Sequence, residues 1–136
     1  MDKINQNNIR IGVAAIIMNQ RGEVFIAKSL KVSGWTVPGG HVNFGETIKK
    51  DVIREVFEET GMDITVVKKI NFYEIIELAN FHMISFHFLC SVIYDKKIKL
   101  DNNELFEGKW VSPLEAFNLI VLDEFKKSIE LFINLK

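Results

Sequence analysis

The sequence predicts an α/β fold in which a mixed β-sheet carries helices on its faces. Two β-rich stretches are separated by an amphipathic helical segment, and further helical segments follow the second stretch. This order is typical of a sheet covered by helices. The chain has 136 residues, of which 48% are hydrophobic and 26% charged, and it contains 11 Phe residues. A single globular domain over residues 1–136 with a sizeable core is therefore expected.

The first β-rich stretch predicts a hairpin followed by a short extended segment. Residues 9–18 are rich in Ile, Val and Ala and predict a buried strand, whereas residues 23–28 alternate as in a strand. Residues 19–22, with the sequence Asn-Gln-Arg-Gly, are typical of the turn between them. A short extended segment is expected at residues 35–37, followed by Pro38, which ends it.

A long helix is expected over residues 47–60. Apolar side chains recur there at three- and four-residue spacing, as on the buried face of a helix: Ile48, Val52, Ile53, Val56 and Phe57. Thr47 or Glu46 can cap the start of this helix, and Gly61 is a typical stop.

The second β-rich stretch predicts two long paired strands. Residues 64–76 and 82–94 have a β-type composition, with a turn at residues 78–81 between them. A polar loop over residues 96–107 and a short strand at residues 110–111 are expected to follow.

Two helices are expected at the end of the chain. Residues 113–119 predict the first, because proline is well tolerated at the first helical position. The second covers residues 123–135 and presents Phe125, Ile129 and Phe132 on one face.

The central helix carries a concentration of carboxylates. Glu55, Glu58 and Glu59 stand at positions i, i+3 and i+4, so that they share one helix face. Two such charges about 6 Å apart repel by roughly 3 kcal/mol at an effective dielectric near 20. A divalent cation such as Mg²⁺ or Mn²⁺ prefers oxygen ligands and would turn this repulsion into coordination. Taken alone, the glutamates are also compatible with a solvated acidic face on which Arg54 and Glu58 form a helix pair.

The residues around these glutamates follow a longer pattern. Starting at Gly40, five residues lead to a glutamate, and seven more lead to Arg54 and Glu55. Residues 56–62 complete the pattern. They are an apolar residue, any residue, two glutamates, any residue, a glycine and a second apolar residue. It resembles the Nudix box over residues 40–62, and the Pro-Gly before it also fits the family.

The resemblance implies a Nudix hydrolase of the MutT-like kind, with an α/β/α sandwich built on a mixed β-sheet. Enzymes of this family cleave a diphosphate linked to a nucleoside, using water and a divalent metal. Mg²⁺ is the expected cofactor, and Mn²⁺ is a substitute. Metal ions neutralise the charge of the diphosphate, which otherwise repels the nucleophile.

Positions that match the family motif imply roles for individual residues. Glu58 and Glu59 match metal ligands, and Glu55 matches a metal ligand or the general base. A backbone carbonyl of Gly39 or Gly40 is expected to supply a further ligand.

The resemblance implies two further members of the site. Arg54 matches the residue that orients a box glutamate, through Glu46. The family often has an acidic residue in a late loop, for which Glu104 is the first choice and Glu107 the second. The expected catalytic group therefore consists of Glu55, Glu58, Arg54 and Glu104.

Several residues are candidates for contacts to the nucleotide. Gly39, Gly40 and His41 stand at the start of the motif, and Lys28 ends a predicted strand where a cation could face phosphate. Asp123 could accept a hydrogen bond from the edge of a base. Ordinary explanations stay open, with Lys28 as a solvated lysine, His41 as a loop residue and Asp123 as a helix N-cap.

The favoured substrate is a nucleoside triphosphate, hydrolysed to a nucleoside monophosphate and pyrophosphate. A proline typical of the ADP-ribose subgroup is absent, because no proline occurs between Pro38 and Pro113. ADP-ribose or another nucleoside diphosphate sugar is the alternative substrate. A non-catalytic nucleotide-binding domain is the alternative from another class, and it is disfavoured because every acidic position of the box is filled.

Charge and composition limit the partners. The formal net charge of −1 disfavours a nucleic-acid binder that works by neutralising phosphates, so no stable nucleic-acid partner is expected. The single cysteine excludes an internal disulfide. The polar first residues contain no apolar signal segment, which favours a cytoplasmic protein without a membrane partner. The sequence leaves the oligomeric state open and is compatible with a homodimer.

Overall fold

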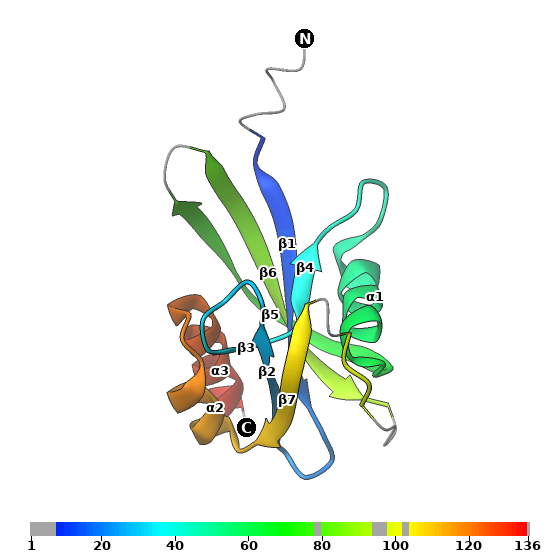
Figure 1. Ribbon diagram of the computed structural model, residues 1–136, viewed down its shortest axis with the longest axis vertical. Coiled ribbons are helices and arrows are strands. Elements are labelled where there is room, and N and C mark those ends of the chain that lie inside the picture. Colours follow the sequence, from blue (N-terminus) through cyan, green and yellow to red (C-terminus); the bar gives the residue numbers. More distant parts are fainter. Residues whose placement is uncertain (1–7, 78–79, 94–97, 102–103, 136) are drawn as a thin grey trace.

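The computed structural model describes residues 8–77, 80–93, 98–101 and 104–135. In chain order these residues form β1 (Arg10–Met18), β2 (Val24–Ser29), β3 (Trp35–Thr36), β4 (Gly39–His41), α1 (Ile48–Thr60), β5 (Ile64–Glu77), β6 (Phe81–Val92), β7 (Leu105–Val111), α2 (Pro113–Leu119) and α3 (Asp123–Leu135) (Figure 1).

The strands build one mixed sheet with β1 at its centre. The strand order is β3-β2-β1-β6-β5, with β4 paired to β1 and β7 paired to β2. β1 runs parallel to β6 along its whole length and antiparallel to β2 and β4. The mixed sheet predicted from the sequence is therefore confirmed.

Helices cover both faces of this sheet, with α1 on one side and α2 and α3 on the other (Figure 1). Successive residues of β1 point to opposite faces, as the geometry of a strand requires. Ile17 belongs to the core that contains Val52 of α1, whereas Ile16 belongs to the core that contains Ala116 and Ile129 of α2 and α3. This explains why β1 is apolar without alternation, and it confirms the α/β/α sandwich.

Helix α1 begins and ends as its sequence predicts. The Thr47 side chain accepts a hydrogen bond from the backbone N–H of Lys50 at 3.2 Å, which makes Thr47 the N-cap. Gly61 has φ 75° and donates its N–H to the Phe57 carbonyl at 2.8 Å. A left-handed backbone of this kind favours glycine at a helix end.

Strand β7 is longer than expected. It begins at Leu105, so the polar loop predicted for residues 96–107 was wrong over its last three residues. Residues 106–109 are all exposed, and they pair with β2 without the alternation that marks a half-buried strand. The strand is therefore held by backbone pairing that the composition does not reveal.

The remaining predicted elements agree with the structure to within a few residues. Ser112 is the N-cap of α2, and Pro113 lies in the first turn of this helix. Residues 78–79, 94–97 and 102–103, which include parts of the predicted turn, strand end and loop, lie outside the described residues. Within the described part of the chain, no helix is both long and apolar enough to cross a membrane.

Candidate active site

Three carboxylates converge at the edge of the sheet. Oxygen atoms of Glu55, Glu59 and Glu104 all lie within 4.8 Å of one another. The first two project from α1 at i and i+4, and the third stands just before β7. Glu59 is buried, with 4% of its surface exposed, and the other two are partly buried.

Backbone hydrogen bonds fix the segment that carries Glu104. Asp101 donates its N–H to the Glu59 carbonyl at 2.9 Å, and Glu104 in turn donates its N–H to the Asp101 carbonyl at 3.0 Å. On the other side, Leu30 donates its N–H to the Glu104 carbonyl at 3.1 Å. Glu104 is thus fastened between the end of α1 and the loop that follows β2.

The two glycines of β4 allow the helix carboxylates to lie against the sheet. Gly39 donates its N–H to Glu59 Oε1 at 3.1 Å. A Cβ atom at Gly39 would collide with the Val13 carbonyl oxygen, and one at Gly40 would collide with the Glu55 carboxylate. Glycine is therefore required at both positions by close approach. The predicted metal-binding role of their carbonyls stays a prediction.

The protein environment shifts the pKa of each carboxyl group in the cluster. Burial, together with the hydrogen bond to Glu104, raises the pKa of Glu59 to about 9. The same hydrogen bond lowers the pKa of Glu104, and Lys31 acts in the same direction. The pKa values of these two neighbouring carboxyls are therefore shifted in opposite directions. Burial also raises the pKa of Glu55, against the opposing charge of Arg54.

Converging carboxylate oxygens of this kind fit a hard divalent cation such as Mg²⁺. Such a cation takes oxygen ligands and would offset the mutual repulsion of the three carboxylates. The donor set therefore fits the cofactor expected from the sequence.

Arg54 organises the acidic residues around the cluster. Its Nε lies 3.2 Å from the Glu46 carboxylate, which supports the expected contact with Glu46. Its Nη2 donates to Asp51 at 2.8 Å and to Glu55 at 3.3 Å.

Glu58 lies apart from the other helix glutamates. Its carboxylate pairs with Arg54 Nη1 at 2.7 Å, and 55% of the side chain is exposed. The structure groups Glu55 and Glu59 with Glu104, and Glu58 is not part of that group. The role of Glu58 as a metal ligand stays a prediction.

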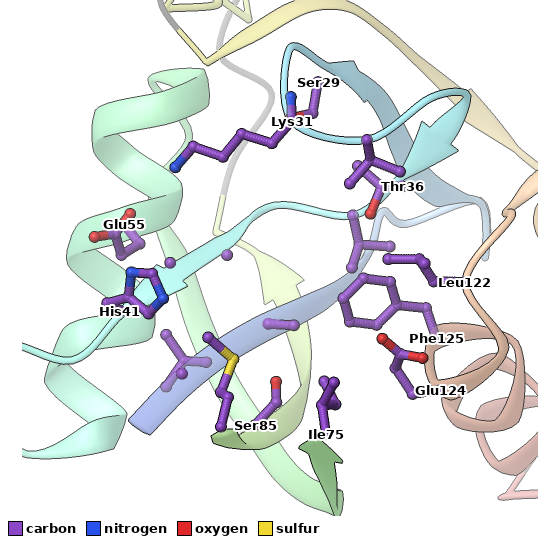
Figure 2. A pocket seen from close by; sticks show the side chains of 18 of the residues that line it. Ser29, Lys31, Thr36, His41, Glu55, Ile75, Ser85, Leu122, Glu124 and Phe125 are labelled. Atoms are coloured by element: carbon purple, nitrogen blue, oxygen red, sulfur yellow. The ribbon is translucent and has the colours of Figure 1, made fainter. Parts of the chain in front are cut away.

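A pocket of about 930 Å³ opens beside the cluster. Its acidic end contains the cluster together with Lys31 and His41, and Figure 2 shows the Lys31 side chain reaching toward the helix that carries Glu55. The other end is mainly apolar, with Leu122 and Phe125 on one wall. The pocket therefore offers one end suited to phosphates and one suited to a flat apolar group.

Gly39, Gly40 and His41, which were candidates for substrate contacts, all line this pocket. Burial and the nearby charge of Arg10 lower the pKa of His41. A neutral imidazole at this place offers an N–H donor to a phosphate oxygen.

Lys28 does not line the pocket. Its Nζ lies 5.0 Å from the centre of the Trp35 ring and 3.6 Å from Glu107. Lys31, in the following loop, lines the pocket instead, with its Nζ 3.6 Å from Glu104. Sequence reasoning missed Lys31 because a loop has no periodicity that predicts where a side chain points.

Asp123 also lies outside the pocket lining, and its neighbour Glu124 takes that place (Figure 2). Asp123 is the first residue of α3 rather than its cap, since the Leu122 carbonyl accepts the N–H groups of Phe125 and Lys126 at 3.1 Å. The pocket wall therefore carries the Glu124 carboxylate, and the predicted contact of Asp123 with a base stays a prediction.

The family model described as NUDIX domain matches residues 8–132. The chain belongs to the Nudix family. Among curated relatives, a putative 8-oxo-dGTP diphosphatase of Bacillus subtilis (strain 168) is 28% identical over 123 residues, which are 90% of this chain and 79% of that protein. An RNA pyrophosphohydrolase of Orientia tsutsugamushi (strain Boryong) is 31% identical over 126 residues, 87% of this chain and 73% of that protein.

Solved structures agree with this assignment. The crystal structure of a MutT protein from Methanosarcina mazei Go1 has a TM-score of 0.78 and 29% identity, and the match covers 95% of this chain and 96% of that one. The predicted Nudix hydrolase fold, and the enzyme class that cleaves phosphoanhydride bonds, are confirmed at the level of the family.

Proposed function

We propose that this Nudix hydrolase cleaves nucleoside triphosphates with water to give a nucleoside monophosphate and pyrophosphate. The observation that carries the proposal is the pocket with the cluster of Glu55, Glu59 and Glu104 at one end and an apolar wall at the other. The triphosphate would bind at the end of the pocket that carries the cluster, and the nucleobase would bind against the apolar wall.

Mg²⁺ is the proposed cofactor, with Glu55, Glu59 and Glu104 as its holders and Mn²⁺ as a substitute. When bound, the cation would neutralise the phosphates and make water a better nucleophile.

The residues of the chain contribute positioning and proton transfer. Glu55 lies against Gly40 at the pocket wall and has a raised pKa, which suits a general base that accepts a proton from the attacking water. Lys31 and His41 offer N–H donors to phosphate oxygens.

The apolar end supports binding of a nucleobase. Phe125 provides an aromatic face, and the Glu124 carboxylate lies beside it (Figure 2). Ser85 adds a hydroxyl group to the lining of the same pocket. Aromatic faces stack with any base, whereas polar groups distinguish one base edge from another.

ADP-ribose and other nucleoside diphosphate sugars are the alternative substrates. The absence of a proline between Pro38 and Pro113 disfavours them. A domain that only binds nucleotides is disfavoured, because such a role does not need three converging carboxylates.

The test is a panel of the four nucleoside triphosphates, ADP-ribose, a nucleotide sugar and RNA with a 5′-triphosphate, each with Mg²⁺. The expected result is monophosphate and pyrophosphate from the free triphosphates. Preferential cleavage of ADP-ribose or of the RNA end would overturn the substrate, and binding without hydrolysis would overturn the reaction. Cell fractionation and size-exclusion chromatography would check the cytoplasmic location and the homodimer, which stay predictions.

A further inference from the structure

Asp51 is a fully buried carboxylate in the first turns of α1, with 0% of its surface exposed. A charged side chain at such a place is costly unless it is paired and hydrogen-bonded. Its Oδ2 accepts two hydrogen bonds, one from the Asn43 backbone N–H at 3.0 Å and one from Arg54 Nη2 at 2.8 Å. Within the described residues its Oδ1 has no hydrogen-bond partner. An apolar side chain at this buried position would avoid the cost of desolvating a charge. The two hydrogen bonds of Asp51 therefore point to a role other than stabilising the helix.

The bond to Arg54 helps to fix the direction of the guanidinium, together with Glu46 on Nε and Glu58 on Nη1. Nη2 carries two N–H groups, and it donates both to Asp51 at 2.8 Å and to Glu55 at 3.3 Å. Because the guanidinium is planar and rigid, fixing one of these donors fixes the direction of the other. The hydrogen bond to Asp51 is the shorter of the two. Asp51 is also the more deeply buried acceptor, since its side chain is 0% exposed and that of Glu55 is 15% exposed.

The bond to Asn43 extends the same control to the pocket wall. Asn43 lines the pocket, and its loop connects β4 to α1. Asp51 therefore binds both the loop that precedes α1 and the guanidinium that contacts Glu55.

We propose that Asp51 is a positioning residue that sets the geometry of the Glu55 carboxylate for metal binding through the Arg54 guanidinium. The proposal rests on the metal site of the proposed function. Asp51 is not one of the three clustered carboxylates, and it acts by keeping one ligand preorganised.

The experiment measures Mn²⁺ binding by calorimetry without nucleotide, together with thermal melting in the absence of metal. Asp51→Asn keeps the shape of the side chain and removes its charge. It is expected to weaken Mn²⁺ binding by roughly 10- to 100-fold, as for other residues that orient metal ligands. Ser128→Ala is the matched control, because it removes a buried hydrogen bond with His87 away from the cluster. It is expected to lower the melting temperature and leave Mn²⁺ binding unchanged.

A double-mutant cycle tests the route through Arg54. In an Arg54→Gln background, Asp51→Asn is expected to weaken Mn²⁺ binding no further, because the group it positions is gone. Additive losses would overturn the route, because Asp51 would then act independently of Arg54. Asp51→Asn that melts lower but binds Mn²⁺ like the wild type would overturn the proposal, leaving a merely structural role. Failure to hydrolyse triphosphates would refute the proposed function alone, since Mn²⁺ binding requires no substrate.

Discussion

The Glu59 backbone carbonyl accepts a hydrogen bond from the Asp101 N–H at 2.9 Å, which ties the helix of the box to the segment before β7. Glu59 therefore contributes twice to the site, with its carboxylate in the cluster and its carbonyl as an anchor for the chain that brings Glu104. Two segments far apart in the sequence are joined at this point. The site depends on a tertiary contact as well as on the helix.

Glu104→Gln is expected to lower metal-dependent turnover by roughly 10²–10³, because it removes an anionic member of the cluster while keeping the backbone anchor. The measurement is steady-state hydrolysis with increasing Mg²⁺. Glu107→Gln is the control, since Glu107 pairs with Lys28 at 3.6 Å outside the pocket lining. A similar loss of turnover in both variants would contradict a specific role of Glu104 in the site.

Glu59→Gln is expected to abolish the stabilisation that Mg²⁺ gives to the folded protein. A ligand that binds only the folded state at 100 times its Kd adds about 2.7 kcal/mol to the free energy of unfolding. The wild type should therefore melt several degrees higher in Mg²⁺ and lose this gain in EDTA. Lys49→Ala, an exposed helix residue, should behave like the wild type. Equal Mg²⁺ shifts in Glu59→Gln and the wild type would contradict the site.

Local spacing was enough to place part of the site. Glu55 and Glu59 stand one helical turn apart, so any helix over the box brings them to one face. Arg54 and Glu58 have the same spacing, and their pairing at 2.7 Å turns Glu58 toward the arginine. This pair was already visible in the sequence as the alternative to a metal-binding face.

The rest of the site depends on contacts that periodicity does not encode. Glu104 could be named only through the resemblance to the family, because its backbone hydrogen bonds to Asp101 and Leu30 decide its position. Lys28 points toward Trp35 and Glu107 because cross-strand pairing with β3 and β7 sets its face. Pairing partners of this kind cannot be deduced from one strand alone.

Gly40→Ala is expected to impair metal binding by displacing Glu55, because a Cβ at this position collides with the Glu55 carboxylate. The Mg²⁺-induced rise in melting temperature should shrink, and turnover should fall. Gly45→Ala is a useful contrast, since its Cβ would meet nothing within 4 Å while its φ of 86° strains any other residue. That variant should lose roughly 1–2 kcal/mol of stability and keep its response to Mg²⁺. A Gly40→Ala protein with a normal Mg²⁺ response would show that Glu55 is free to move.

Acid should destabilise the protein through His87, which is fully buried between β6 and α3 and hydrogen-bonded to Ser128. Burial lowers its pKa from 6.5 to about 4, so the folded state binds this proton less readily than the unfolded state. The contribution to stability is complete above about pH 6.5 and is lost as the pH falls toward 4, with a total of roughly 3 kcal/mol. Urea unfolding at pH 7.5 and pH 5 measures the change. His87→Gln is expected to be less stable at both values but to show a smaller difference between them. His82→Gln, on a partly exposed histidine that contacts Glu74, should keep the wild-type difference. If His87→Gln also keeps it, the acid sensitivity arises from other groups.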